Sequence, residues 1–191
     1  MANQEPLNQI SPKVKMNAYG FDETTEYQLD EQCEWVGALF NELEEEVDRE
    51  EDDYSLGHIS LSLSVKRKSA KPFGDHLLVA GEFNAKYFAP CIRCLKLTPQ
   101  DLKADFKAAF LHSRNEKEPE FEELDEIFAD NEEWSLYFYE KGQADVAEMA
   151  HENLFININH FPLHDENCKG LCLECGHNLN ESPCPKHSPK S

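Results

Sequence analysis

The chain has 191 residues, 18 of them basic and 38 acidic, so its formal net charge at pH 7 is −20. At this length, 40 % hydrophobic residues and twelve phenylalanines are enough to build a core without disulfides. The negative charge repels bare nucleic acid at long range, which leaves basic proteins, or an RNA contact confined to a local basic patch, as the expected partners.

The N-terminal half predicts a helix and a β-hairpin. Residues 1–20 contain no apolar signal-peptide core, so we expect a cytoplasmic protein without a membrane segment. After an extended segment at 14–17, apolar residues recur every four positions over 31–47, which predicts a helix. An acidic run follows at 44–53. Apolar residues alternating with serines at 56–65 predict a strand, and a second strand at 76–88 completes the hairpin.

The C-terminal half predicts further strands and one more helix. Residues 97–111 begin with Thr98-Pro99, which suits a helix start, but their apolar and charged residues alternate and favour a strand. The segment 116–133 is dominated by carboxylates and predicts a loop with at most a short helical turn. A strand is expected at 134–139, followed by a helix at 142–157 that Asp145 can cap.

These elements predict an α+β fold, an antiparallel sheet with one or two packed helices. The boundaries are a domain at 1–163 and a Cys/His-rich, zinc-knuckle tail at 164–191 docked on it. The tail contains too few large apolar residues to form a core of its own.

The cysteines carry the strongest chemical signal. There are seven, and an odd number in a cytoplasmic chain favours metal or redox chemistry over disulfides. Cys33 stands alone in the predicted helix, where we expect a small buried side chain. Cys91 and Cys94 form a CxxC pair, whose two sulfurs suit tetrahedral zinc, although the same spacing also serves thiol redox chemistry.

The tail holds a denser set of candidate ligands, and Gly176, directly after the CxxC pair of Cys172 and Cys175, permits a positive-φ turn. With the first pair, the candidates are enough for two tetrahedral zinc sites: Cys91, Cys94, His164, Cys168, Cys172, Cys175, Cys184 and His187.

Two divisions of these ligands are open. The preferred one joins Cys91 and Cys94 to His164 and Cys168, and leaves Cys172, Cys175, Cys184 and His187 (or His177) for a second ion. The rival places the last four cysteines on one zinc and leaves the first pair as free thiols.

Recognised catalytic motifs are missing from the sequence: there is no GxSxG, P-loop, GxGxxG or HExxH pattern. We therefore expect a protein that is not an enzyme. A partner or nucleic-acid contact would use the cations near the hairpin turn and the cysteines, namely Lys66, Arg67, Lys68, Lys71, Arg93, Lys96 and Lys169.

Two segments give a family resemblance. The run Cys91-Ile92-Arg93-Cys94-Leu95 resembles the CxRCL signature of the YceD-type 23S ribosomal RNA accumulation proteins. The run from Phe161 to Asn180, followed by Cys184, is similar to their C-terminal signature, and the helix after Asp145 resembles their central helix. The resemblance covers roughly residues 55–185.

The resemblance implies an α+β domain and a non-enzymatic role in ribosomal RNA accumulation and large-subunit assembly. Some relatives lack the part that corresponds to Cys172–Cys184 but keep the matches to Cys91, Cys94 and Cys168, which favours the preferred division of ligands.

Three functions compete. The first is an accessory factor with structural zinc that acts through basic ribosomal proteins or the precursor large subunit, since complementary charge speeds encounter. The second is a direct RNA-binding zinc protein, and the third a CxxC thiol redox protein. The net charge favours the first.

Overall fold

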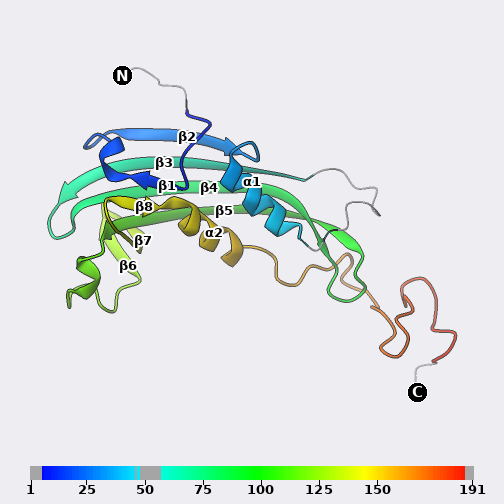
Figure 1. The fold of residues 1–191 in the computed structure, drawn as a ribbon. Helices are drawn as coiled ribbons and strands as arrows, with labels where there is room; N and C mark the ends of the chain where they lie inside the picture. Colours follow the sequence, from blue (N-terminus) through cyan, green and yellow to red (C-terminus); the bar gives the residue numbers. More distant parts are fainter. Residues whose placement is uncertain (1–5, 46, 48–56, 188–191) are drawn as a thin grey trace.

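The computed structural model describes residues 6–45, 47 and 57–187, and its main element is one long, twisted sheet (Figure 1). The six strands lie in the order β2-β3-β4-β5-β7-β6. Every neighbouring pair is antiparallel except β5 and β7, which run parallel. Their bounds are β2 Thr24–Asp30, β3 His58–Ala70, β4 Gly74–Pro90, β5 Leu97–His112, β6 Glu126–Ala129 and β7 Glu132–Tyr139.

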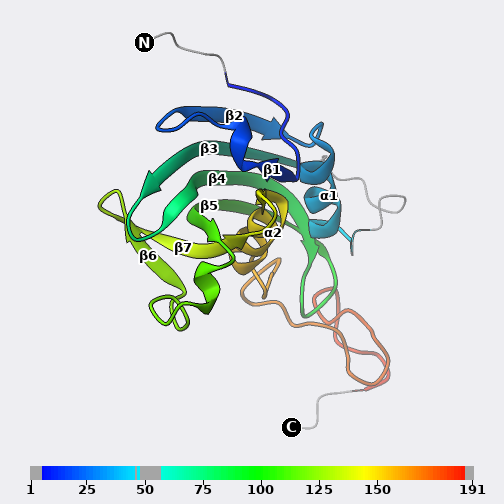
Figure 2. The same cartoon turned by 60° about the vertical axis from the view of Figure 1, so that its left-hand side comes forward.

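Both helices pack on the same face of this sheet (Figure 2). They are α1, Glu34–Leu43, and α2, Val146–Ile156, accompanied by a two-stranded ribbon of β1, Lys13–Lys15, and β8, Gln143–Asp145. The main core lies between them and the sheet, because alternate residues of β3 such as Ile59, Leu61 and Leu63 point inward. No helix in the described part of the chain is long and apolar enough to cross a membrane.

A second, smaller core lies on the opposite face, near β6 and β7. It contains Leu78, Leu111, Phe121 and Trp134, and the Trp134 indole Nε1–H donates to the Ala129 carbonyl at 2.9 Å. Residues on either side of Leu78 in β4 point into the main core, as the two-residue period of a strand requires. Strands β4 and β5 therefore bury side chains on both faces of the sheet near this core.

The α+β prediction is confirmed, with several differences in the elements. The first helix spans 34–43 rather than 31–47, with buried Cys33 at its N-cap. Residues 97–112 form a strand, and β3 runs on to Ala70, while the predicted start of β3 at residue 56 lies outside the described residues. The second helix starts at Val146 because the preceding three residues form β8, and Asp145 caps it by accepting from the Glu148 N–H at 3.1 Å.

The prediction of a loop over 116–133 is wrong for its second half. Glu126–Ala129 is a strand that pairs with β7 across a turn in which Asp130 and Asn131 both have positive φ. The first half contains a short 3₁₀ turn at Asn115–Lys117, as expected. The acidic run that begins at Glu44 also has a buried member, since the Glu44 carboxylate accepts from the Phe88 backbone N–H at 3.1 Å.

The β4–β5 hairpin positions the candidate site. Its two strands stay paired from Leu77 and Phe110 to Pro90 and Leu97, so it extends beyond the helices. The loop at its far end contains Cys91 and Cys94. The chain after α2 returns to the same end of the sheet, where the Pro162 carbonyl accepts from the Ile92 N–H at 3.0 Å.

Candidate metal centres

The eight predicted ligands fall into two groups of four, and in each group the donor atoms lie within 4.8 Å of one another. We call them centre A and centre B. Centre A is Cys91, Cys94, His164 and Cys168, and centre B is Cys172, Cys175, Cys184 and His187. The membership is that of the preferred division rather than that of the rival with a single zinc.

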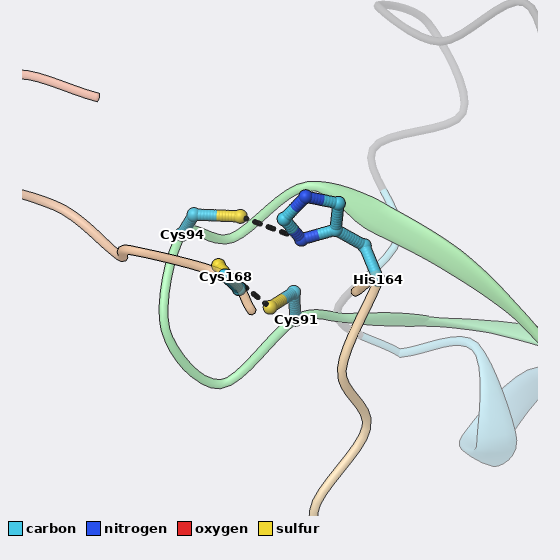
Figure 3. Close-up of side chains that lie close together, drawn as sticks. All are labelled: Cys91, Cys94, His164 and Cys168. Carbon is cyan, nitrogen blue, oxygen red and sulfur yellow. Dashed lines mark hydrogen bonds between the residues drawn. The ribbon is translucent and has the colours of Figure 1, made fainter. Parts of the chain in front are cut away.

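Centre A joins two distant parts of the chain (Figure 3). Cys91 and Cys94 come from the β4–β5 loop, and His164 and Cys168 from the segment after α2. The Sγ atoms of Cys91 and Cys168 are 3.9 Å apart, and Cys94 Sγ lies 3.3 Å from His164 Nδ1. All three cysteines are buried, with Leu163 and Leu171 packed against them.

The pKa values of the first two thiols in centre A are shifted in opposite directions. Burial raises the pKa of Cys91, but hydrogen bonds from the His164 side chain and from neighbouring backbone groups outweigh it and lower the pKa to about 5. Burial raises the pKa of Cys94 to about 11, and the adjacent Cys168 and Cys91 sulfurs act in the same direction. One thiolate therefore disfavours the next, and a bound divalent cation would allow all of them to ionise.

Centre B lies wholly within the tail and is more exposed. Cys175 is exposed, Cys172 and His187 are half-buried, and only Cys184 is buried. The Sγ atoms of Cys175 and Cys184 are 3.6 Å apart. Nδ1 of His187 lies 3.7 Å from Cys172 Sγ and 3.6 Å from Cys184 Sγ.

A carboxylate behind His187 was not predicted from the sequence. Glu174 Oε2 lies 3.0 Å from His187 Nε2, so it fixes the ring with Nδ1 facing the sulfurs. A carboxylate on the second ring nitrogen is the usual support for a metal-binding histidine. His177, the alternative ligand, has Nε2 at 2.9 Å from the Ser182 hydroxyl and does not belong to centre B.

The donor geometry tests which metal fits. Tetrahedral zinc, with Zn–S near 2.3 Å and Zn–N near 2.0–2.1 Å, requires sulfurs about 3.8 Å apart and sulfur–nitrogen distances of about 3.6 Å. The measured sulfur pairs at 3.9 and 3.6 Å and the sulfur–nitrogen pairs at 3.3 to 3.7 Å match this edge length. Three thiols and one imidazole also form a donor set that zinc favours.

Each centre is built on a turn with the same hydrogen bonds. In centre A, Leu95 N–H donates to the Cys91 carbonyl at 2.9 Å and Cys91 N–H to the Lys96 carbonyl at 2.9 Å. In centre B, the Gly176 N–H bonds to the Cys172 carbonyl at 2.8 Å, and the Cys172 N–H to the His177 carbonyl at 2.8 Å. Both CxxC pairs therefore lie on knuckle turns rather than at a helix start, where a reactive redox cysteine commonly lies.

The predicted cationic contact residues do not gather in one patch. Lys66 and Lys68 pair with Asp130, and Arg67 forms a two-pronged ion pair with Asp75 while it stacks on Phe21. These three and Lys71 lie at one end of the β3–β4 hairpin, whereas Arg93, Lys96 and Lys169 lie near the metal centres at the other end of β4.

Arg93 connects the β4–β5 loop to the tail. Its Nη1 donates to the carbonyls of Cys168 at 3.0 Å and Glu166 at 3.2 Å, and its own carbonyl accepts from the Leu171 N–H. In the described ranges, Lys71, Lys96 and Lys169 form no ion pair.

Comparison with protein families identifies the chain. The family described as large ribosomal RNA subunit accumulation protein YceD matches residues 79–191, more than half of the chain. The chain belongs to the YceD family. The matched part begins within β4 and includes both metal centres, whereas α1 and strands β1 to β3 precede it. Comparisons with curated proteins and with solved structures gave no match.

Membership of the YceD family gives the chain a role in accumulation of the large ribosomal RNA subunit, which is what the family is described as doing. The description concerns an accumulation factor and names no catalytic reaction.

Proposed function

We propose that this protein is a non-enzymatic accessory factor for large-subunit ribosomal RNA, with two structural zinc ions, that acts in the cytoplasm by binding basic ribosomal proteins or the precursor subunit. The observation that carries the choice of partner is the charge of residues 116–133, which we call the acidic end. It contains ten carboxylates and one lysine.

The carboxylates of the acidic end lie on a segment whose apolar side chains are packed in a core. Phe121, Ile127 and Trp134 bury their side chains in the smaller core, while all ten carboxylates between Glu116 and Glu133 are exposed. Asp130 and Glu132 are ion-paired with lysines, and the other eight have no ion pair in the described part of the chain. A concentrated negative field on an ordered scaffold attracts lysine-rich and arginine-rich proteins.

The zinc ions serve as structural links in this proposal. Each centre has four protein donors and no open position, which is characteristic of structural rather than catalytic zinc. Centre A would fasten the tail, residues 164–191, to the domain at 1–163. The Ile92–Pro162 and Arg93–Leu171 backbone hydrogen bonds support that docking.

Binding assays with matched variants test the proposal. The zinc-loaded full chain is titrated with purified basic large-subunit ribosomal proteins and with ribosomal RNA fragments over a range of salt concentrations. We expect tighter binding to one or more of the proteins, and weak, steeply salt-dependent binding to RNA. Tight, salt-insensitive RNA binding would instead favour a direct RNA contact.

The matched variants locate the interaction. Replacement of Glu120, Glu122 and Glu123 by glutamine removes three charges from the acidic end. The control replaces Glu23, Glu26 and Glu31, which are equally exposed but lie on or next to β2, at the opposite edge of the sheet. We expect the first variant to lose affinity several-fold and the control to change it much less, because the charge change is the same and only its place differs. Equal losses would place the interaction elsewhere.

A further inference from the structure

Asn180 connects the two metal centres. It lies in the tail between Cys175 and Cys184 of centre B, yet its Nδ2 lies 3.5 Å from the Sγ of Cys168 in centre A and donates to it. The same amide nitrogen donates to Asn178 Oδ1 at 2.9 Å, and the side-chain oxygen accepts from the Lys169 N–H at 2.8 Å. Asn180 is a ligand of neither centre.

The backbone fixes the orientation of this side chain. The Lys169 N–H can only donate, so the Asn180 atom that faces it must be the oxygen. Asn178 is fixed in the same way, because its Oδ1 accepts from the Asn180 backbone N–H at 3.0 Å. The two amide hydrogens of Asn180 therefore point to Asn178 Oδ1 and to the Cys168 sulfur.

Centre B helps to hold the segment that carries Asn180. Leu171 and Asn178 form a β-bridge across the knuckle, and the Leu179 N–H donates to the Gly170 carbonyl at 3.0 Å. Beyond these contacts, the position of the segment depends on Cys175 and Cys184 being held together. Loss of their shared metal would release the end of this short loop at Cys184 and loosen the segment that carries Asn180.

We infer that Asn180 is a positioning residue for centre A, through which an occupied centre B strengthens metal binding at centre A. This inference rests on the zinc centres proposed above. An N–H donor stabilises a thiolate and holds its lone pairs in place, and loss of such an outer partner typically weakens metal affinity about 10–100-fold. The more exposed centre B loses its ion first, and that loss removes the donor from the buried centre A.

Asn180→Asp removes the N–H···S bond, together with the hydrogen bond to Asn178 Oδ1. Aspartate retains an oxygen that accepts from the Lys169 N–H but has no hydrogen to donate to Cys168. The matched control is Asn167→Asp, which introduces the same charge beside Cys168, at an exposed residue whose side chain forms no hydrogen bond in the described part of the chain.

Chelator competition on the full-length protein measures the overall affinity for the two zinc ions, in which the link between the centres is included, and cobalt substitution reports on the sulfurs. For Asn180→Asp we expect that affinity to fall about 10–100-fold. The sulfur-to-cobalt charge-transfer band should move to lower energy, because the thiolate is no longer stabilised. Asn167→Asp should leave both readouts as in the wild type.

A double-mutant cycle tests the link to centre B. Cys175→Ser/Cys184→Ser leaves centre A alone and without its donor, so adding Asn180→Asp to it should cause little further loss of zinc affinity. The inference would be overturned if Asn180→Asp bound zinc with wild-type affinity. It would also be overturned if Asn180→Asp caused the same loss of zinc affinity with and without Cys175→Ser/Cys184→Ser. A wild-type protein that binds no zinc would instead overturn the proposed zinc centres, so the two failures are distinguishable.

Discussion

Leu95 and Gly176 occupy the same position in the two knuckle turns, with φ of +63° and +71°. Each follows the second cysteine of its CxxC pair and donates its N–H to the carbonyl of the first. The left-handed conformation costs glycine nothing, but it costs a residue with a side chain about 1–2 kcal/mol. Centre A is thus built on a strained turn and centre B on a relaxed one, and the Leu95 side chain is 64 % exposed.

Gly176→Ala and Leu95→Gly are opposite tests of this difference. A Cβ at Gly176 would meet nothing within 4 Å, so Gly176→Ala should weaken zinc binding at centre B only through backbone strain, by up to about 30-fold. Leu95→Gly removes the strain, but it also stabilises the unfolded chain by about 0.4–1 kcal/mol through added conformational entropy. Centre A should therefore bind zinc as tightly as before or more tightly. Chelator competition measures both, and a looser centre A in Leu95→Gly would contradict the argument.

The number of zinc ions is a second prediction. Two complete donor sets predict two ions per chain in a freshly prepared, reduced sample, counted from the mass of the native protein against that of the denatured protein. Cys91→Ser and Cys184→Ser should each reduce the count by one, since each removes a ligand from a different centre. One ion in the wild type would favour the rival single site, and none would exclude the zinc centres.

The sequence predicts those parts of the fold that depend on local pattern. The alternation of Ile59, Leu61 and Leu63 predicts β3, and the cap at Asp145 marks the start of α2. The metal ligands are also predictable, because few other roles explain so many cysteines and histidines in one tail. The spacing of these ligands leaves their division open, since it depends on the β4–β5 loop lying next to His164, and the family resemblance was needed to favour the grouping that the structure has.

Two features depend on contacts that a local reading does not reveal. Strand β6 lies in a run of carboxylates, although Asp130-Asn131 between Ile127 and Trp134 is a hairpin signal that could have identified it. The parallel pairing of β5 with β7 joins strands separated by most of the acidic end. The contact of Asn180 with Cys168 likewise requires the folded tail.

The Asp130–Lys68 pair predicts a pH dependence. Asp130 lies in the β6–β7 turn, and its pKa is lowered mainly by the hydrogen bond from Lys68 of β3. A carboxyl group whose pKa is lower in the folded state than in the unfolded state stabilises the fold at pH values above the unfolded pKa, about 3.9. This stabilisation is lost as the pH falls through the pKa of the folded state. Since both groups are partly exposed, the effect is at most about 1 kcal/mol.

Asp130→Asn measures this contribution. At pH 7 the variant should unfold at slightly lower urea concentration than the wild type, as followed by the fluorescence of Trp134, which is buried in the same small core. The difference should shrink as the pH falls from 7 to below the lowered pKa of Asp130, where the wild-type carboxyl is also protonated. A difference of the same size at both pH values would mean that the pair contributes through packing rather than charge.

The two centres should differ in what they contribute to the stability of the whole domain. Centre A joins the β4–β5 loop to the segment after α2, so its metal closes the long stretch of chain from Cys94 to Cys168. The loop-closure expression for a disulfide, applied to this metal link, gives an upper bound of about 4.5 kcal/mol. That is a large part of a typical stability of roughly 5–15 kcal/mol. Centre B closes only the short loop within the tail.

Cys94→Ser and Cys168→Ser should therefore lower the melting temperature of the domain, whereas Cys184→Ser in excess zinc should mainly loosen the tail. The fluorescence of Trp35 and Trp134 reports the unfolding of the domain, because Trp35 packs against the main core and Trp134 lies in the smaller one. Even if loss of centre B weakens zinc binding at centre A, excess zinc keeps centre A occupied. If Cys184→Ser lowers the melting temperature as much as Cys94→Ser, the division into two centres is wrong and a single shared cluster is the better description.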